Sequence, residues 1–580
     1  MNGTNPENNF TLCQQRNQIL DNTGHMLIVG GPGAGKTTIG LLKARRWILQ
    51  QTESEQQVLF LSFSNSAIRR IIESADGILT KDVADQVNIK TYHSFAWEII
   101  KSHGYLISSR RNLSIISAQD AAVRAAGLDD NDWYTEQNRL YDEDGLVTYD
   151  QFAPRAVEIL NRSSTALDCF CTAYPLILVD EFQDTDEDQW ALVKLLAKKS
   201  IIIALGDSEQ RIYEWRPGVS GTRLQEFTES LDSESFDFTT ENNRSPATGI
   251  AGFARSLLSP NTQPDFPDDI SLLRFPPKQF KNRLHIAVRK ALSKANDSKN
   301  NDRPTVAVAA RSAALVRRIS DALSDQAMLP NRTFNPVPHD ILFNQNQVLL
   351  SARVIAHIMS TMSNPKHVQA ASILRCIADV MRSKGNITGI KNSDTLAKWA
   401  DKCDDDIFPK TKCVKAISSV IDKLNQNGFV GSPTHDWITI RDLLEASGTK
   451  ELELIANQAR YLRLLRRGSI IEQSLISLWS SQGNYKGAEI ALERAILQHQ
   501  LSDTHRESAT VTVMNMHQLK GREYDAVVLV EDKYSTFSAK DTLPLYSETR
   551  RLLQVALTRA RHHVVILTHR GENTFDLLSK

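Results

Sequence analysis

Short apolar runs recur along the first half of the chain, and longer stretches with helical spacing separate them. The runs occupy residues 26–29, 58–63, 176–179 and 201–205. Continuous apolar runs of this length, bounded by polar residues, are typical of strands buried on both faces of a parallel sheet. The pattern therefore predicts an α/β fold in which helices cover a parallel sheet.

A glycine-rich segment, IVGGPGAGKTT at residues 28–38, overlaps the end of the first apolar run. It fits the pattern G-x-x-x-x-G-K-[ST], in which backbone N–H groups turn inward around phosphate oxygens at the start of a helix. A chance glycine-rich turn is the alternative. We expect Lys36 to reach the β- and γ-phosphates and Thr37 to place its hydroxyl on Mg²⁺. The nucleotide-binding candidates in this segment are Gly30, Gly31, Pro32, Gly33, Ala34, Gly35, Lys36, Thr37 and Thr38.

Two adjacent carboxylates, Asp180 and Glu181, follow the apolar run at residues 176–179. In open α/β sheets the ligand lies beyond the C-terminal ends of the strands, so the pair is expected to face the phosphates. Asp180 is then a candidate to hold Mg²⁺, and Glu181 to orient and deprotonate the attacking water. An acidic pair is usually a solvated cluster, but the buried strand before it and the phosphate loop upstream favour function.

Two glutamines extend the candidate site. Gln15 and Arg16 lie on a helix predicted over residues 12–20. Gln15 can read a purine edge through a paired donor and acceptor, although a surface glutamine is the simpler interpretation in isolation. Gln210 follows the run at residues 201–207, where a glutamine beside the γ-phosphate can report on its presence.

Aromatic residues near these strand ends are candidates for contact with nucleic-acid bases. Tyr213 and Trp215 stand next to Arg216, and base stacking on such side chains contributes about 1 to 3 kcal/mol per base. Phe63 is either a core residue or a stacking platform, and the sequence favours the core.

Composition limits the remaining possibilities. A chain of 580 residues suggests about four domains. Lys plus Arg equals Asp plus Glu at 68 each, so any basic groove has to be local. The six cysteines form no CxxC pair, which predicts scattered reduced thiols and no zinc or iron–sulfur site. The chain has neither a signal-like N-terminus nor an apolar run long enough to span a membrane, so we expect a soluble cytoplasmic protein with no membrane partner.

The ordered motifs resemble the UvrD/Rep/PcrA branch of superfamily 1 helicases. The resemblance rests on Gln15 and on GPGAGKT, FSNSA, TYHSFA, VDEFQDTDEDQ, GDSEQRIYEWR and ENNRS. In the second half VAVAARS resembles the strand that opens the second motor domain, and MNMHQLKGREYDAVVLV and ETRRLLQVALTRARHHVVIL resemble the fifth and sixth motifs. The resemblance covers residues 12–260, 304–365 and 505–570, and it implies two RecA-like motor domains that use ATP and Mg²⁺.

The resemblance also implies roles for the matching positions. Gln210 matches the γ-phosphate sensor, and Arg216 matches the arginine of the third motif. Arg244 and Arg559 match arginine fingers from separate lobes, so both are expected to engage only when the cleft between the lobes closes. The catalytic candidates are Lys36, Asp180, Glu181, Gln210, Arg244 and Arg559.

The fifth motif and the DNA track are assigned in the same way. Gly521 and Glu523 match the fifth motif, whose glutamate normally faces the nucleotide sugar. Family analogy implies translocation from 3′ to 5′. The positions that match the single-strand track are Phe63, Asn65, His93, Tyr213, Trp215 and His517.

Two positions depart from the family pattern. The family commonly stacks adenine between an arginine after GKT and a tyrosine in N-Y-R-S, and here these positions are Thr38 and Asn243. Weak stacking leaves Gln15 and Arg16 as the main readers of adenine. We therefore predict reduced discrimination between ATP and other nucleoside triphosphates.

The motifs divide the chain into four parts. Residues 1–103 and 145–258 form a first RecA-like domain, residues 104–144 a small inserted subdomain, residues 259–365 and 506–580 a second RecA-like domain, and residues 366–505 a helical insertion. We thus expect each motor domain to carry an inserted helical subdomain, although residues 104–144 are irregular and polar in sequence. Within the helical insertion, a basic stripe is either a solvated helix face or a contact with duplex DNA or a partner. The stripe consists of Arg460, Arg463, Arg466 and Arg467.

The sequence favours a DNA-dependent ATPase that acts as a motor on single-stranded or forked DNA. The rival is a sensor subunit that regulates a partner nuclease without productive unwinding. The chain ends soon after the sixth motif, and we find no D…E-x-K cluster of the kind that suggests a nuclease, so we expect any nuclease to be a separate chain. Short UvrD-like proteins of this kind resemble helicase-like subunits, such as GajB, that accompany OLD-family nucleases in anti-phage systems such as Gabija. An RNA helicase and an unrelated P-loop enzyme are further alternatives.

Overall fold

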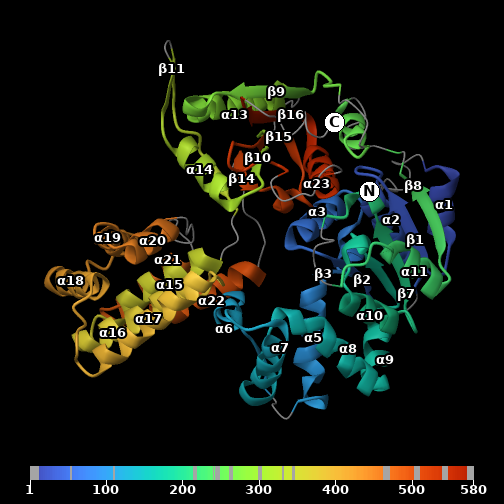
Figure 1. Cartoon of the computed structure of the whole chain (residues 1–580). Helices are drawn as coiled ribbons and strands as arrows, with labels where there is room; N and C mark the ends of the chain where they lie inside the picture. The colour runs from blue at the N-terminus through green and yellow to red at the C-terminus, as the bar shows by residue number, and fades with distance from the viewer. Residues whose placement is uncertain are drawn as a thin grey trace. The chain divides into compact units, whose positions relative to one another are not determined.

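Two six-stranded parallel sheets form the framework of the described structure (Figure 1). The computed structural model describes residues 12–51, 55–108, 112–212, 218–239, 241, 248–259, 265–297, 303–329, 332–342, 346–460, 470–501, 510–538 and 546–570. They group into two units, the first of which is Met1–Ser108, Phe152–Phe343 and His505–Lys580, and the second Ser109–Gln151 and Asn344–Thr504. The four-part division drawn from the sequence stays a prediction; it began the helical insertion at residue 366, later than the second unit's start at Asn344.

The first sheet confirms the parallel sheet predicted from the apolar runs. Its strand order is β3 (Val87–Thr91), β2 (Val58–Ser62), β6 (Leu176–Val179), β7 (Ile201–Gly206), β1 (Met26–Gly30) and β8 (Glu234–Phe238). Every residue of β2 and β6 is buried. Because all neighbouring strands are parallel, their C-terminal ends share one edge, which carries the phosphate loop, the acidic pair and Gln210.

Helices cover this sheet to form lobe 1. They are α1 (Gln14–Asp21), α2 (Lys36–Gln50), α3 (Asn65–Asp76), α4 (Lys81–Ala84), α5 (Tyr92–His103), α8 (Phe152–Arg162), α9 (Ser164–Ala173), α10 (Glu187–Leu196) and α11 (Arg223–Leu231). A methyl group at Gly40 of α2 would lie 2.9 Å from Leu178 Cδ2, so the absence of a side chain lets α2 approach the sheet closely. This packing fixes the position of the phosphate loop.

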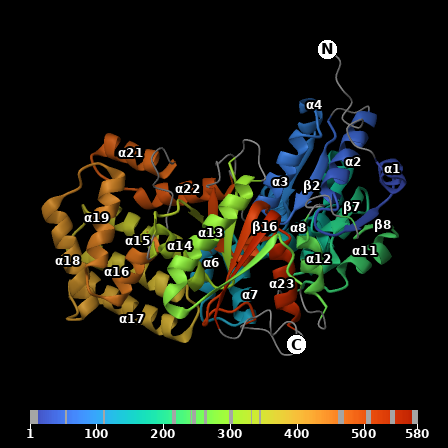
Figure 2. The same ribbon diagram turned by 90° about the horizontal axis from the view of Figure 1, so that it is seen from above.

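The second sheet forms lobe 2 of the same unit. Its strand order is β13 (Asp340–Ile341), β14 (Val511–Asn515), β10 (Val306–Ala310), β15 (Tyr524–Val530), β16 (Ala560–His569) and β9 (Ile270–Phe275). Its helices are α12 (Ile250–Ser256), α13 (Phe280–Asp297), α14 (Ala313–Ser324) and α23 (Ser547–Leu557), and a hairpin joins β11 (Ala327–Leu329) to β12 (Arg332–Phe334). Helix α13 packs beside β16 (Figure 2).

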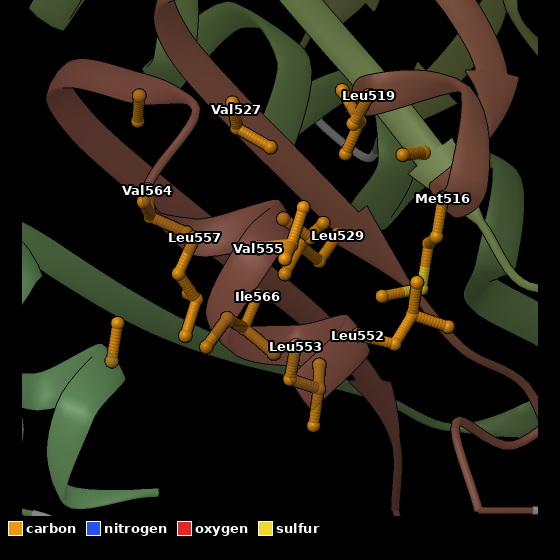
Figure 3. Packing of buried hydrophobic residues seen from close by; sticks show 14 of the residues in the cluster. Met516, Leu519, Val527, Leu529, Leu552, Leu553, Val555, Leu557, Val564 and Ile566 are labelled. Atoms are coloured by element: carbon orange, nitrogen blue, oxygen red, sulfur yellow. The ribbon is translucent and has the colours of Figure 1, made fainter. Parts of the chain in front are cut away.

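One hydrophobic core of lobe 2 lies between α23 and the sheet (Figure 3), and a second packs α13 and α14 against the sheet. Leu552 and Leu553 of α23 pack with Ile566 of β16 in this cluster. Ile250 and Phe253 of α12 belong to it as well. Helix α12 therefore packs with lobe 2, although it follows the last strand of lobe 1 along the chain.

The second unit is mostly helical. It contains α6 (Ala118–Ala125), α7 (Asp130–Arg139), β4 (Ser114–Ile115), β5 (Leu146–Val147), α15 (Asn346–Thr361), α16 (Lys366–Arg382), α17 (Ile387–Asp404), α18 (Lys412–Asn427), α19 (Pro433–Glu445), α20 (Lys450–Ala459), α21 (Ile470–Gln482) and α22 (Ala488–Leu501). Helices α6 and α7 agree with the helical character expected of the small inserted subdomain, although its sequence is irregular and polar. Arg353 joins the two chain segments of this unit by donating hydrogen bonds of 2.6 and 3.0 Å to the carboxylate of Asp120.

Two smaller expectations can be compared with the structure. All six cysteines are free thiols, as predicted. Helix α20 ends at Ala459, with Arg460 as its C-cap, and the three remaining arginines of the basic stripe lie outside the described residues. Among the described residues, none of the helices combines the length and apolar character needed to cross a membrane.

Candidate nucleotide-binding site

The phosphate loop joins β1 to α2. Gly33 and Gly35 have φ angles of 82° and 84°, a left-handed conformation that side chains disfavour. A methyl group at Gly30 would lie 2.9 Å from Ala34 Cβ, so the loop is too tight for one. Lys36 Nζ donates to the carbonyl oxygens of Gly30 and Gly31 at 2.5 and 3.2 Å, which holds the ammonium inside the loop. The residues form a cradle that fits a polyphosphate.

Helix α1 brings a guanidinium against the loop. Arg16 Nη2 donates to the carbonyl oxygen of Ala34 at 3.2 Å and forms an ion pair with Glu241. The guanidinium lies 4.9 Å from the ring centroid of Phe238. Gln15, the predicted adenine reader, is exposed on the same helix. The structure thus brings Arg16 to the loop, and the role of Gln15 stays a prediction.

Asp180 stands at the end of β6. Its backbone N–H donates to the carbonyl oxygen of Leu61 at 2.8 Å, so the sheet fixes its position. Its side chain is buried, and Oδ2 accepts no hydrogen bond from the described residues but lies 3.7 Å from Arg70 Nη2. Burial and the neighbouring Glu181 carboxylate raise the pKa of Asp180. An unsatisfied buried carboxylate oxygen is the kind of group that a cation satisfies.

Glu181 adopts a φ angle of 53°, which is uncommon for a residue with a side chain. Gln183 Nε2 donates to Glu181 Oε2 at 2.7 Å, and Gln183 Oε1 accepts from the backbone N–H of Asp207 at 3.0 Å. The buried Gln183 therefore ties the carboxylate of Glu181 to the end of β7. Burial opposes ionisation of Glu181, but the ammonium groups of Lys520 and Lys36 outweigh it and lower its pKa.

Residues of lobe 2 reach this edge of lobe 1. Lys520 forms a buried ion pair with Asp184, donates to the carbonyl oxygen of Gln210 at 2.7 Å, and lies 3.8 Å from Glu181 Oε2. Arg559 Nη2 donates to Gln210 Oε1 at 2.7 Å. The structure therefore brings together four of the six catalytic candidates, and Lys36 joins them from the phosphate loop. These four are Asp180, Glu181, Gln210 and Arg559.

A second connection between the lobes involves the fifth motif. Arg70 of α3 lies 3.6 Å from Glu523, which also pairs with Arg561 at 3.2 Å. Gly521 has a φ angle of 75°, and a methyl group there would lie 3.5 Å from Ser64 Oγ of lobe 1. The expected contact of Glu523 with the nucleotide sugar stays a prediction.

Sequence reasoning missed Arg70, Gln183 and Lys520. Lys520 stands directly before Gly521 in the segment QLKGREYD, so its position in the motif was available as a signal. Arg70 and Gln183 gave no such signal, because an arginine on a helix and a glutamine after an acidic pair are common on protein surfaces.

Aromatic side chains gather near the strand ends of lobe 1. The Phe63 and Tyr92 rings pack edge to face with centroids 5.8 Å apart. Trp97, which the sequence did not single out, stacks on Phe152 at 5.3 Å, and His93 packs against the same ring at 6.1 Å. Phe63, His93 and Trp97 are the partly exposed members of these two groups, and such rings can support stacking with bases.

The remaining track residues are placed in part. His517 Nδ1 lies 3.0 Å from Asn515 Oδ1 in lobe 2. The side chain of Asn65 lies outside the described part of the structure. Four other predicted site residues lie wholly outside it, and so does one of the two positions at which the sequence departs from the family pattern. These five are Tyr213, Trp215, Arg216, Arg244 and Asn243.

The metal expectation can be tested against the donor set. Within the described ranges, no group of three or more His, Cys, Asp or Glu side chains could hold a metal ion by itself. Magnesium usually takes one or two protein ligands together with phosphate oxygens, rather than an all-protein cage. Thr37 in the phosphate loop and the buried Asp180 fit such a shared site.

A phosphate loop on one parallel sheet and an arginine delivered from a second define a two-lobed P-loop enzyme. The family model described as the UvrD/REP helicase N-terminal domain matches residues 12–140 and 126–231, and the UvrD-like helicase C-terminal domain matches residues 510–567. Both matches identify UvrD-like helicase domains in this chain and support a UvrD-like superfamily 1 helicase.

Individual relatives agree with the family. The ATP-dependent DNA helicase PcrA of Leuconostoc citreum is 22% identical over 632 residues, which cover 96% of this chain and 81% of that protein. DNA helicase II of Haemophilus influenzae is 24% identical over 295 residues, and PcrA of Staphylococcus aureus Mu50 is 23% identical over 299 residues. These two matches cover 43% and 44% of this chain, and only 40% of each relative.

Proposed function

We propose that the chain is an ATP-dependent DNA helicase that moves along single-stranded DNA, from 3′ to 5′ by family analogy, and unwinds the duplex ahead. The observation that carries this proposal is the direct contact between lobes at the nucleotide site, above all the hydrogen bond from Arg559 to Gln210. A site completed by both lobes links hydrolysis to their relative motion, which a motor requires.

The chain's own residues suggest a division of labour. Lys36 and the backbone N–H groups of residues 33 and 35–37 bind the polyphosphate, and Thr37 and Asp180 would hold Mg²⁺. When bound, Mg²⁺ supplies charge neutralisation for the phosphoryl oxygens. Glu181 orients and accepts a proton from the attacking water through its Oε atoms, with Gln183 holding its carboxylate. Arg559 neutralises charge on the phosphoryl group from lobe 2.

The DNA track follows from the same arrangement. We assign the single strand to the aromatic rings of Phe63, His93 and Trp97 on lobe 1 and to His517 on lobe 2. Stacking on aromatic rings tolerates any base sequence, as a translocating enzyme needs. A change in the separation of the lobes would move the two parts of the track past each other.

The test compares ATP hydrolysis with strand displacement on a forked duplex that has a 3′ tail. We expect single-stranded DNA to stimulate hydrolysis more than RNA does, and wild-type protein to unwind the fork. Glu181→Gln should abolish both activities. Glu229→Gln, an exposed position on α11, is the matched control and should leave both unchanged. DNA-stimulated hydrolysis without any displacement by wild-type protein would overturn the motor and favour a sensor that serves a separate nuclease.

A further inference from the structure

Helix α12 carries an arginine that belongs to none of the signature motifs and yet reaches the phosphate loop. Arg255 Nη2 donates to the carbonyl oxygen of Thr239 at 2.7 Å. A methyl group built on Gly31 would lie 3.1 Å from that same oxygen and 3.7 Å from Arg255 Nη2. The guanidinium therefore lies directly beside the loop that cradles the phosphates.

The helix that carries Arg255 is fixed to lobe 2. Ile250, Phe253 and Leu257 are buried in the lobe 2 core together with residues of α23. Arg550 of α23 donates to the carbonyl oxygen of Leu257 at 2.7 Å and so ties the end of α12 to α23. The opposite side of α12 presents Arg255 to lobe 1. Arg255 thus belongs to lobe 2, and its side chain lies beside the phosphate loop of lobe 1.

The Arg255 guanidinium has N–H donors that a ligand can use. It is 52% exposed, and its Nε lies 3.9 Å from Glu209 Oε2, which is a weak ion pair for such an exposed side chain. Glu209 in turn accepts from Gln554 of α23 at 3.3 Å. A guanidinium has five N–H donors, so a hydrogen bond to one carbonyl leaves most of its donors available to phosphate oxygens.

We propose that Arg255 is a nucleotide-binding residue that contacts the polyphosphate of the bound nucleoside triphosphate and senses closure of lobe 2 on lobe 1. It supplies a positive charge beside Gly31, in addition to the charge that Arg16 brings to Ala34. This proposal rests on the nucleotide site of the proposed function but not on unwinding.

The test measures equilibrium binding of a fluorescent, non-hydrolysable ATP analogue with Mg²⁺ to the full chain. Hydrogen bonds to charged groups contribute enough that Arg255→Gln should weaken binding by roughly tenfold or more. Arg255→Lys keeps the charge but loses the forked donor geometry, and should weaken binding less. Arg46→Gln removes a surface arginine of α2 that pairs with Asp21 and should leave the affinity unchanged.

Two further readouts separate this role from a structural one. Affinity for single-stranded DNA in the absence of nucleotide should be the same in wild type and Arg255→Gln, because the substitution leaves the apolar side of α12 intact. Analogue affinity that is unchanged in both Arg255 variants would overturn the proposal, as would equal loss of DNA binding. Binding of the analogue is measured without turnover. If the wild-type protein binds the analogue but does not unwind DNA, the proposed motor function is refuted and the proposal for Arg255 is not.

Discussion

Lys520 should control the acidic limit of ATP hydrolysis. Its ammonium lies 3.8 Å from Glu181 Oε2 in a buried setting. At an effective dielectric constant of about 20, unit charges about 4 Å apart interact by about 4 kcal/mol, equivalent to about 3 pKa units. Lys36, Arg70 and Arg559 also lower the pKa of Glu181 and remain after Lys520→Met. We therefore expect the pKa of Glu181 to rise by at least about 1 unit in this variant.

The sign of the effect follows from the proposed role of Glu181 as a base. Its pKa is lowered in the folded enzyme, so the carboxylate stays charged until the pH falls through that low value. Raising the pKa shifts the loss of activity to higher pH. The acidic limb of the rate of DNA-stimulated ATP hydrolysis should move up by at least about 1 pH unit in Lys520→Met.

A second substitution separates this electrostatic effect from damage to the fold. Lys520→Met leaves Asp184 buried without its ammonium partner, and breaking a buried pair on one side costs about 3 to 5 kcal/mol of stability. Lys520→Met combined with Asp184→Asn removes the uncompensated charge. The double variant should regain thermal stability while its acidic limb stays shifted. Acidic limbs that coincide in wild type and the double variant would refute the reasoning.

Two further predictions concern other parts of the chain. Burial disfavours protonation of His357, but its contacts with Cys376 and Glu489 outweigh burial and raise its pKa to about 10. The resulting stabilisation is complete below the ordinary pKa of 6.5 and is lost as the pH rises through about 10. In thermal unfolding, His357→Gln should therefore lower the melting temperature by several degrees near pH 6 and by little above pH 10. Equal losses at both pH values would contradict this expectation. Because Thr38 replaces a stacking arginine, steady-state hydrolysis of GTP should come within about tenfold of that of ATP, and a strong preference for ATP would disprove it.

The fold was predictable because its signal is local. Four continuous apolar runs predicted the buried strands of the first sheet, and the structure confirms all four as β1, β2, β6 and β7. A strand buried on both faces is a continuous apolar run, so it can be recognised without knowing which strands pair with it. The helices of the insertion at residues 104–144 have a weaker local signal, because polar helices such as α7, which has one fully buried residue, have no clear apolar stripe.

The candidate site was predictable only where its chemistry is written in a motif. The acidic pair and the phosphate loop carry their function in adjacent residues, and the structure brings them to one edge of the sheet. Lys520 acts on Asp184, which lies 336 residues away in the chain. No local pattern records such a contact, because it exists only after two lobes have folded and met.

Helix α12 shows why a residue outside the motifs can belong to the site. Its apolar side is buried in the same core as α23, and Arg550 ties the two helices together, so they are expected to move as one body. One body then carries two arginines, Arg255 toward the phosphate loop and Arg559 toward Gln210. Any change in the separation of the lobes should move both guanidinium groups together. Arg255→Gln and Arg559→Gln should therefore affect nucleotide binding non-additively, because each arginine engages only in the closed state that the other stabilises.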